Sequence, residues 1–507
     1  MDFLNHLYMA FAVSLEPANL LFCFAGVFLG TLVGVLPGIG PTAVISLLLP
    51  ITFNMSAVQS IIMLAGIYYG AYYGGSTTSI LVNIPGEAAS VITCLDGYQM
   101  ARKGRAGPAL GISAFGSFIG GTFAVLMLMW FAPPLAKMAL KFGPPENAAL
   151  MFFGLTMATY LSSGSILKSL IMMTLGLLLG TIGKDSVSGN MRFTMDILEL
   201  GEGLSIVPVV MGLFGISEVL INLETSLAQG DVFKTKFKNL FPTKTDWKES
   251  AGPITRGSIL GFFLGLLPGG GGIIASFLSY ALEKKISKKP YEFGKGAIAG
   301  VAGPETANNA GAGGTFIPLL TLGIPCNVVL AMLMGALMIH GVTPGPLLLK
   351  DHPQLFWGVV GSMYLGNIML LVLNLPLIGL WVQILRVPYR YLFPLIFLFC
   401  LIGAFSLNNN IFDMLIMIFF GIVGYLLKKI RFSAAPLILA LVLGPMLEEA
   451  MHQSLVLSGG SFLIFLSRPI SMILILLSFT LLISSFVLPL IKKKQPGELQ
   501  DLQGSDP

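Results

Sequence analysis

Apolar stretches fill most of this chain, and their length restricts it to one environment. A helix that crosses a bilayer needs about 20 mostly apolar residues. When runs interrupted by Gly or Pro are counted as broken spans, the sequence holds about 10 to 12 transmembrane helices. Only 10% of the 507 residues are charged and the mean hydropathy is +0.85, too little polar surface for a water-soluble fold. The sequence therefore predicts an all-α polytopic membrane protein.

Two parts of the chain resemble each other in landmarks that follow in the same order. The motif GTLVGVLPGIGP at residues 30–41 matches GFFLGLLPGGGG at residues 261–272. An Ile-Pro pair then follows at residues 84–85 and again at residues 324–325, and a Gly-Pro pair comes later in both parts. A common order with nearly constant spacing indicates a duplication rather than shared apolar composition.

The charge of the loops indicates that the two halves have opposite orientations, because short cytoplasmic loops collect Lys and Arg. In the first half, the early loop at residues 50–56 has no charge and the later loop at residues 102–105 is basic. In the second half, the early loop at residues 284–295 is rich in Lys and the later loop at residues 340–354 is not. We therefore expect two inverted-topology repeats, related by an axis in the membrane plane.

The same charges predict a hairpin in each half. The basic linker and the loop at residues 284–295 would both be cytoplasmic, so the apolar segment between them must enter the membrane and return. We expect re-entrant hairpins with tips at residues 37–41 and 268–272, and arms of about 10 to 14 residues that cross half of the hydrocarbon core. The expected division is a first half at 1–222, a cytoplasmic linker at 223–256, a second half at 257–427, C-terminal helices at 428–490 and a cytoplasmic tail at 491–507.

Glycine-rich stretches at residues 74–78 and 311–315 predict two further breaks at membrane depth. A broken helix offers free backbone N–H groups and the positive end of its dipole, which together attract an anion. No Lys or Arg lies before Arg102 or between Lys295 and Lys350, so an anion would depend on helix ends, hydroxyls, amides and bound cations. The predicted substrate-binding residues are Gly38, Gly40, Ser76, Thr77, Thr78, Gly270, Gly271, Asn308, Asn309 and Thr315.

The segment GPETANNA, residues 303–310, is the sharpest polar signal between apolar regions. A carboxylate in the membrane is a functional candidate, and Glu305 could ligate a cation, carry a proton or cap the start of a helix. The adjacent amides of Asn308 and Asn309 favour contact with a substrate or cation. The predicted cation-binding residues are Asn83, Glu305 and Thr306, for co-transported Na⁺ or H⁺. No other cofactor and no structural metal site is predicted, since Cys and His share no ligand spacing.

The remaining polar residues have structural interpretations. Glu87 is interpreted as a dipole partner in the first turn of a helix. The spacing of Tyr68, Tyr69, Tyr72 and Tyr73 is helical, and packing or interface anchoring explains them. The net charge of +5 comes from loop lysines and does not indicate nucleic-acid binding. No GxSxG, HExxH or GxxxxGK[ST] motif supports a protease or an ATPase.

Four motifs resemble the large membrane subunit of tripartite tricarboxylate transporters, the TctA type. They are PGIGPTAVISLLLP (37–50), YYGAYYGGSTTSILVNIPGEAAS (68–90), GPETANNA (303–310) and LGIPCN (322–327). The likeness extends over most of the chain, and Cys326 departs from it where a glycine like Gly86 is expected. The resemblance implies a bacterial cell inner-membrane system with a periplasmic solute-binding protein, a small four-helix membrane subunit, an ion gradient and a carboxylate substrate such as citrate.

By that resemblance the chain would be a secondary transporter subunit, not an enzyme, that takes up a tricarboxylate or dicarboxylate. The lysines that begin its C-terminal tail predict a cytoplasmic C-terminus. An ion channel or passive anion pore would also use helix ends and broken spans, but it would need neither a cation gradient nor a binding protein. An enzyme acting on lipid-linked anions would need a cluster of acid–base groups in the membrane, for which Glu305 alone is little support.

Overall fold

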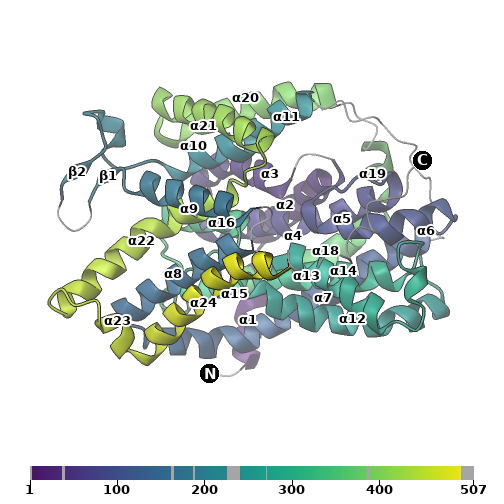
Figure 1. The fold of residues 1–507 in the computed structure, drawn as a ribbon. Helices are drawn as coiled ribbons and strands as arrows, with labels where there is room; N and C mark the ends of the chain where they lie inside the picture. The colour runs from purple at the N-terminus through teal and green to yellow at the C-terminus, as the bar shows by residue number, and fades with distance from the viewer. Residues whose placement is uncertain are drawn as a thin grey trace.

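The structure is a computed structural model that describes residues 3–36, 40–161, 165–185, 189–224, 240–269, 271–384 and 389–492. Most of these residues are helical (Figure 1). Two short strands, β1 (Gly183–Lys184) and β2 (Met191–Arg192), pair in antiparallel fashion at one side of the molecule. The all-α prediction is confirmed.

The helices of the first part of the chain are α1 (Phe3–Ser14), α2 (Pro17–Val35), α3 (Pro41–Leu48), α4 (Ala57–Val82), α5 (Val91–Thr93), α6 (Gln99–Arg102), α7 (Ala106–Ala139), α8 (Pro144–Tyr160), α9 (Ile166–Gly180), α10 (Ile206–Val210) and α11 (Ser217–Glu224). Those of the second part are α12 (Lys244–Gly265), α13 (Gly271–Ile286), α14 (Ala299–Gly314), α15 (Phe316–Leu322), α16 (Val328–Ile339), α17 (Leu348–Asp351), α18 (Pro353–Asn374), α19 (Ile378–Ile384), α20 (Tyr389–Asn408), α21 (Ile411–Lys429), α22 (Ala435–Leu457), α23 (Ile464–Ser467) and α24 (Pro469–Lys492).

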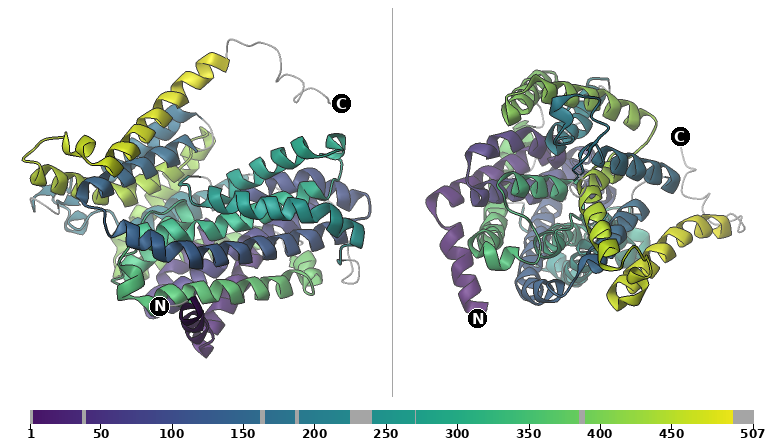
Figure 2. Two further views of the ribbon diagram at one scale, coloured as in Figure 1. Left: turned by 90° about the horizontal axis from the view of Figure 1, so that it is seen from below. Right: turned by 90° about the vertical axis from the view of Figure 1, so that its left-hand side faces the viewer.

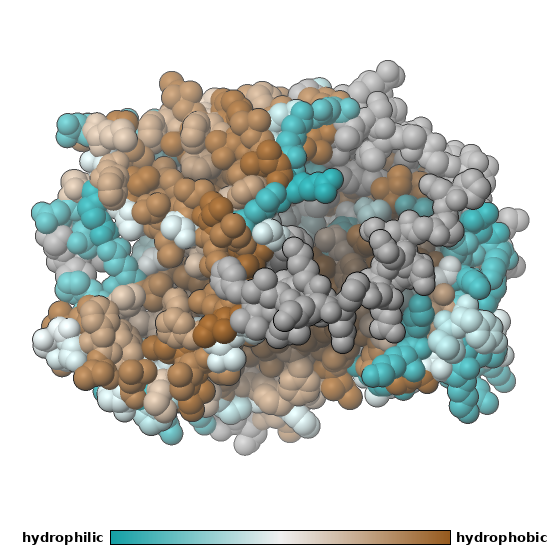
Figure 3. Space-filling model, viewed as in Figure 1, coloured by the Kyte–Doolittle hydropathy of each residue, from teal (hydrophilic) through white to brown (hydrophobic). Residues whose placement is uncertain are grey.

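Several helices are long and apolar enough to cross a bilayer. In the described part of the chain, five meet that condition, namely α2, α7, α18, α21 and α22, and shorter apolar helices accompany them. Figure 3 shows the surface that results: hydrophobic residues form a broad area in the middle, and hydrophilic residues gather at the left and right sides. The chain is therefore a multi-pass membrane protein, as predicted, and the full number of spans stays a prediction.

Two helix pairs, α2 with α4 and α12 with α14, pack with their backbones in contact. An ideal Cβ on three glycines of α2 would lie 2.2–2.5 Å from carbonyl oxygens of α4, and on three glycines of α12 it would lie 2.1–2.6 Å from those of α14. The glycines are Gly26, Gly30 and Gly34 on α2 and Gly257, Gly261 and Gly265 on α12. Small residues allow this close approach, which is a common way to pack membrane helices. The same packing thus occurs once in each half.

The predicted break at residues 74–78 is wrong, because α4 runs without interruption from Ala57 to Val82. Its glycines serve packing instead: an ideal Cβ at Gly74 would lie 2.2 Å from the backbone oxygen of Thr31 on α2. The helix ends only at Asn83, which adopts a left-handed backbone with φ of 60°.

The predicted break at residues 311–315 is a weak one. Helix α14 ends at Gly314 and α15 starts at Phe316, yet Thr315 between them keeps helical dihedral angles. The chain leaves the helix at Gly323, where φ is 71°. In both halves the true interruption therefore follows the glycine-rich stretch, by about one and a half turns of helix in the first half and about two in the second. Glycines that pack against a neighbour do not by themselves end a helix.

The segments predicted as hairpins form the helix pairs α2–α3 and α12–α13, whose first helices are longer than the expected arms. Their re-entry from one side of the membrane stays a prediction. Helix α2 has 19 residues and α12 has 22, which is enough to cross most of a bilayer. Helix α12 begins at Lys244 because Thr243 and Asp246 form a capping box, so the predicted linker, residues 223–256, ends about 13 residues early. Of the predicted tips, residues 37–39 and 270 lie outside the described residues.

The basic loops of the two halves meet at one end of the molecule. Lys103 donates a hydrogen bond to the backbone oxygen of Lys295 at 2.6 Å, and Arg105 forms an ion pair with Asp246. At the other end the weakly charged loops approach each other, since the Ser60 hydroxyl lies 3.0 Å from His340 Nε2. The early loop of each half thus lies beside the later loop of the other half.

The C-terminal helices pack on the first part of the chain rather than forming a separate unit. Helices α22 and α24 lie against α8, and α22 also lies against α9, where an ideal Cβ at Gly176 would be 2.2 Å from the backbone oxygen of Leu437. Figure 2 shows this group of yellow and blue helices to one side of the teal helices that include α12 and α14. The predicted cytoplasmic tail, residues 491–507, lies mostly outside the described residues.

Candidate functional site

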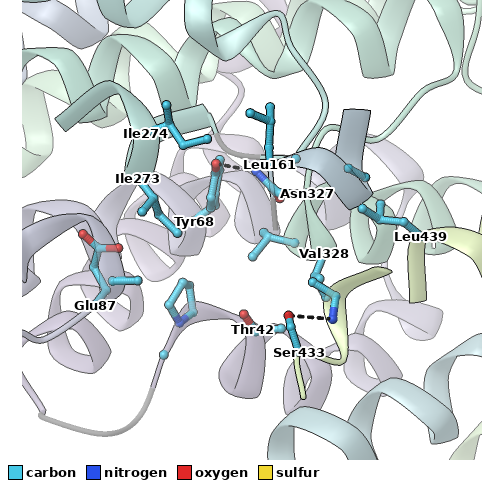
Figure 4. Close-up of a pocket in the computed structure, with 18 of the residues that line it drawn as sticks. Thr42, Tyr68, Glu87, Leu161, Ile273, Ile274, Asn327, Val328, Ser433 and Leu439 are labelled. Carbon is cyan, nitrogen blue, oxygen red and sulfur yellow. Dashed lines mark hydrogen bonds between the residues drawn. The ribbon is translucent and has the colours of Figure 1, made fainter. Parts of the chain in front are cut away.

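A cavity of about 490 Å³ lies between the two hairpins (Figure 4). It is lined by the N-terminal residues of α3 and α13 and by the segments that follow the two left-handed interruptions. The lining residues are Gly40, Pro41, Thr42, Tyr68, Tyr72, Glu87, Ala88, Ala158, Leu161, Gly269, Gly272, Ile273, Ile274, Phe277, Asn327, Val328, Val329, Ser433, Ala435 and Leu439. A volume of this size suits a small organic molecule.

Helix N-termini converge on this cavity. Helices α3, α13, α16 and α22 all begin there, at Pro41, Gly271, Val328 and Ala435. Each N-terminus carries N–H groups without partners inside the helix and the positive end of a dipole. None of the described lining residues is Lys or Arg, and Glu87 is the one carboxylate among them, so the groups in the wall that could attract an anion are the backbone N–H groups of these helix ends.

Two equivalent loops form opposite parts of the cavity wall. After Asn83 and after Gly323 the chain runs through Ile-Pro to an N-cap residue four positions later. That residue is Glu87 in the first half and Asn327 in the second, and both have extended backbone, with φ and ψ of −147° and 168° against −154° and 175°. The loop keeps this shape although Cys326 replaces the glycine found at Gly86.

A small polar network covers one side of the cavity. The Asn327 side chain accepts a hydrogen bond from the Leu330 N–H at 3.0 Å and donates one to the Tyr68 hydroxyl at 2.9 Å (Figure 4). Tyr72 donates to the same Tyr68 oxygen at 3.3 Å. Their helical spacing predicted packing or interface anchoring for these tyrosines, and Asn327 was not among the predicted site residues. The signal that could have found them is the repeat itself, which aligns Asn327 with Glu87.

A second polar cluster lies within the helix bundle around Glu305. The side chain is fully buried on α14, and its carboxylate accepts hydrogen bonds from the Ser76 hydroxyl of α4 and the Thr93 hydroxyl of α5. The side chains of Ser113 and Asn308 lie beside it. No ion pair of the described residues includes Glu305. One carboxylate among neutral oxygens is a donor set that a monovalent cation or a proton can use.

The two neighbouring amides extend this cluster toward α7. Asn309 Nδ2 donates to the Ser117 hydroxyl at 2.8 Å and to the Asn308 side-chain oxygen at 2.6 Å. Asn308 Nδ2 is buried and makes no hydrogen bond within the described residues. The Asn308 side chain lies beside the Glu305 carboxylate, so the two form one buried polar group that could contact a substrate or cation.

The structure divides the predicted site residues into three groups. Of the predicted substrate residues, Gly40 lines the cavity and Gly271 begins α13 beside it, whereas Gly38 and Gly270 lie outside the described residues. Ser76, Glu305, Asn308 and Asn309 form the buried cluster instead. The others lie apart from both: Thr78, Thr306 and Thr315 donate to backbone oxygens, Asn83 ends α4, and Thr77 is buried in α4.

The fold and the cavity together define a multi-pass helical membrane protein with a site of the size of a small molecule between its two helix pairs. Comparison with known proteins identifies the family. The model of the tripartite tricarboxylate transporter TctA family matches residues 20–439, and the chain belongs to that family. It is therefore a component of a tripartite transporter system that works with partner proteins.

Two relatives from Agrobacterium vitis are similar to this chain. One is an uncharacterized 52.8 kDa protein in the TAR-I ttuC' 3'region, 52% identical over 495 residues, which is 98% of each chain. The other is an uncharacterized protein in the TAR-II ttuC' 3'region, 51% identical over 235 residues, which is 46% of this chain and 97% of that one. No solved structure matches the chain.

Proposed function

We propose that this protein carries out cation-coupled uptake of a small carboxylate, a tricarboxylate or dicarboxylate such as citrate, across the bacterial inner membrane. It would receive the substrate from a periplasmic solute-binding protein and work beside a small four-helix membrane subunit. Membership of the TctA family supports the transporter component and the kind of partners. The substrate, the coupling and the membrane are the parts that we propose.

The convergence of helix N-termini on a cavity without lysine or arginine carries this proposal. Helix ends stabilise a carboxylate through N–H groups and dipoles, but each attracts it less than a full positive charge would. Moderate binding suits a transporter, because a substrate that binds too tightly is not released. The hydroxyls of Thr42, Tyr68 and Ser433 add donors that orient the carboxylate groups.

Two inverted repeats that meet at this cavity would give it access to both sides of the membrane in turn. Two observations support the repeat, and a third supports its inversion. The glycine packing recurs in α2–α4 and α12–α14, and the loops ending at Glu87 and Asn327 share their geometry. At each end of the molecule, the early loop of one half meets the later loop of the other half. The basic end would be cytoplasmic by the positive-inside rule, as would the C-terminus.

The experiment uses the chain reconstituted in vesicles with its two partner proteins. We expect labelled citrate to accumulate against its gradient when an inward Na⁺ or H⁺ gradient is imposed, and not without one. Thr42→Val removes one donor from the cavity and should lower uptake about tenfold. The control Thr255→Val changes a hydroxyl on α12 that bonds only its own helix, at Ala251 O, and should transport normally. Downhill flux with no dependence on a gradient would identify a passive pore instead.

A further inference from the structure

One carboxylate lies in the wall of the anion-binding cavity itself. Glu87 lines the cavity, and Figure 4 shows its side chain on the side opposite Leu439. Its Oε2 accepts a hydrogen bond from the Ala89 N–H at 2.9 Å. Its Oε1 is buried and has no hydrogen-bond partner among the described residues. A buried carboxylate oxygen without a partner is costly, so this atom is expected to bind a proton or a cation.

Capping alone does not explain a glutamate at this position. Asn327 occupies the equivalent place in the other half and caps α16 with its amide oxygen. Short polar side chains such as Asn, Asp and Ser are the preferred caps, and Glu is not among them. An uncharged residue would therefore meet the structural need at position 87. The negative charge must serve another purpose.

The packing around Glu87 holds the charge in place. An ideal Cβ at Gly75 would lie 2.9 Å from Glu87 Cγ, so the missing side chain at Gly75 makes room for the glutamate against α4. The titratable groups that face Glu87 are Tyr72 on α4 and Glu305 on α14. Neither is a cation, and Glu305 repels the charge of Glu87.

An anionic substrate would meet this charge as it enters the cavity. The helix ends attract a carboxylate, whereas an ionised Glu87 repels it. A cation bound to Glu87 removes that repulsion and also gives Oε1 its missing ligand. Because binding free energies are reciprocal, a cation that favours the substrate is itself favoured by it. This reciprocity is what couples a cation gradient to uptake.

We infer that Glu87 binds the co-transported monovalent cation, Na⁺ or H⁺, inside the substrate cavity and so couples the cation to the substrate. The inference rests on the proposed function for its role in transport. Cation binding itself is testable without transport. Glu305, behind α4, contributes a second negative potential that raises the affinity of the cavity for a cation.

The test measures thermal unfolding of the purified chain in lipid nanodiscs, first with cations alone. One arm compares NaCl with choline chloride at about pH 8, where free carboxyl groups are ionised. The other arm lowers the pH in choline chloride. A cation that binds the folded state raises Tm. We expect the Tm of the wild type to rise in one of the two arms and the Tm of Glu87→Gln not to rise. The control Glu199→Gln changes an exposed carboxylate on the segment Leu198–Leu200 and should keep the wild-type rise.

Adding citrate separates this inference from the proposed function. In the wild type, the apparent citrate affinity measured from Tm should rise about tenfold or more with the effective cation, and in Glu87→Gln it should be independent of the cation. The inference is overturned if neither cation changes the Tm of the wild type, or if the Tm of Glu87→Gln responds to the cation as that of the wild type does. A normal cation response with no effect of any carboxylate would leave Glu87 as the cation site and count against the proposed substrate.

Discussion

The Ser76 hydroxyl on α4 donates a hydrogen bond to the Glu305 carboxylate on α14, which joins the central helices of the two halves. The residues are 229 positions apart in the chain. Thr93 donates to the other oxygen of the same carboxylate, so the first half supplies both hydroxyls and the second half supplies the acceptor. The contact between the halves is therefore polar as well as tightly packed.

Replacing Glu305 should separate its structural role from its charge. In Glu305→Ala the buried hydroxyls of Ser76 and Thr93 lose their acceptor, which should lower the free energy of unfolding by about 2 to 4 kcal/mol. In Glu305→Gln one oxygen remains as an acceptor, so the loss should be smaller. Thermal unfolding in detergent checks both values. Equal stability of Glu305→Ala and the wild type would contradict the observed hydrogen bonds.

Replacing Asn308 should reduce transport and leave the fold intact. Its Nδ2 has no partner among the described residues, and Asn309, which donates to its oxygen, also donates to Ser117. Asn308→Ala should therefore cost about 1 kcal/mol or less in stability and lower citrate uptake by about tenfold or more. Uptake and thermal unfolding measured on the same preparation test the two effects. Uptake equal to that of the wild type would remove Asn308 from the site.

The close packing of α12 on α14 predicts that one added methyl group is harmful at some glycines and harmless at others. An ideal Cβ at Gly261 would lie 2.1 Å from Ala307 O, whereas at Gly335 on α16 nothing lies within 4 Å. Gly261→Ala should lower the unfolding free energy by about 1 to 3 kcal/mol. The matched control Gly335→Ala should raise it by about 0.5 to 1 kcal/mol. Similar effects from both would argue against the helix contact.

The contact between Lys103 and Lys295 predicts that both loops are labelled from the same side of the membrane. Single cysteines at these exposed positions should react with a membrane-impermeant maleimide only from the cytoplasmic face. A cysteine at Asp351, the exposed last residue of α17, should react only from outside. The native Cys23, Cys326 and Cys400 are buried and should stay unreactive. Labelling of Lys103→Cys and Lys295→Cys from different sides would reject the inverted arrangement.

The repeat was readable from the sequence because it left matched motifs. The distance from Pro37 to Pro268 and the shared Ile-Pro pairs were enough to align the halves. The structure then places glycines of both halves in equivalent contacts, Gly30 against Ile67 O and Gly261 against Ala307 O. The family followed from the same motifs. Sequence patterns of this kind survive because close backbone contact tolerates no side chain.

Only some of the predicted site residues lie at the cavity, and the difference has one cause. The glycines near Ser76 were predicted to break the helix, but they are packing residues in the continuous helix α4. Residues such as Ser76 and Thr78 therefore lie inside the bundle rather than at a helix end. Tyr68 and Glu87, which were given structural roles, line the cavity instead. The sequence alone does not show whether a glycine ends a helix or allows a neighbouring helix to pack closely against it.

By itself, the sequence determined that the chain is an all-α membrane protein, that its halves are related and that an anion would find few fixed positive charges at the centre. These properties can be read from composition and from the spacing of motifs, because they depend only on local hydropathy and on the order of residues along the chain. Only the tertiary structure decided which polar groups share one space. The meeting of Glu87 with Asn327 across a cavity, and of Ser76 with Glu305 behind it, arises from contacts between distant segments. Such contacts depend on how helices pack, which local sequence does not specify.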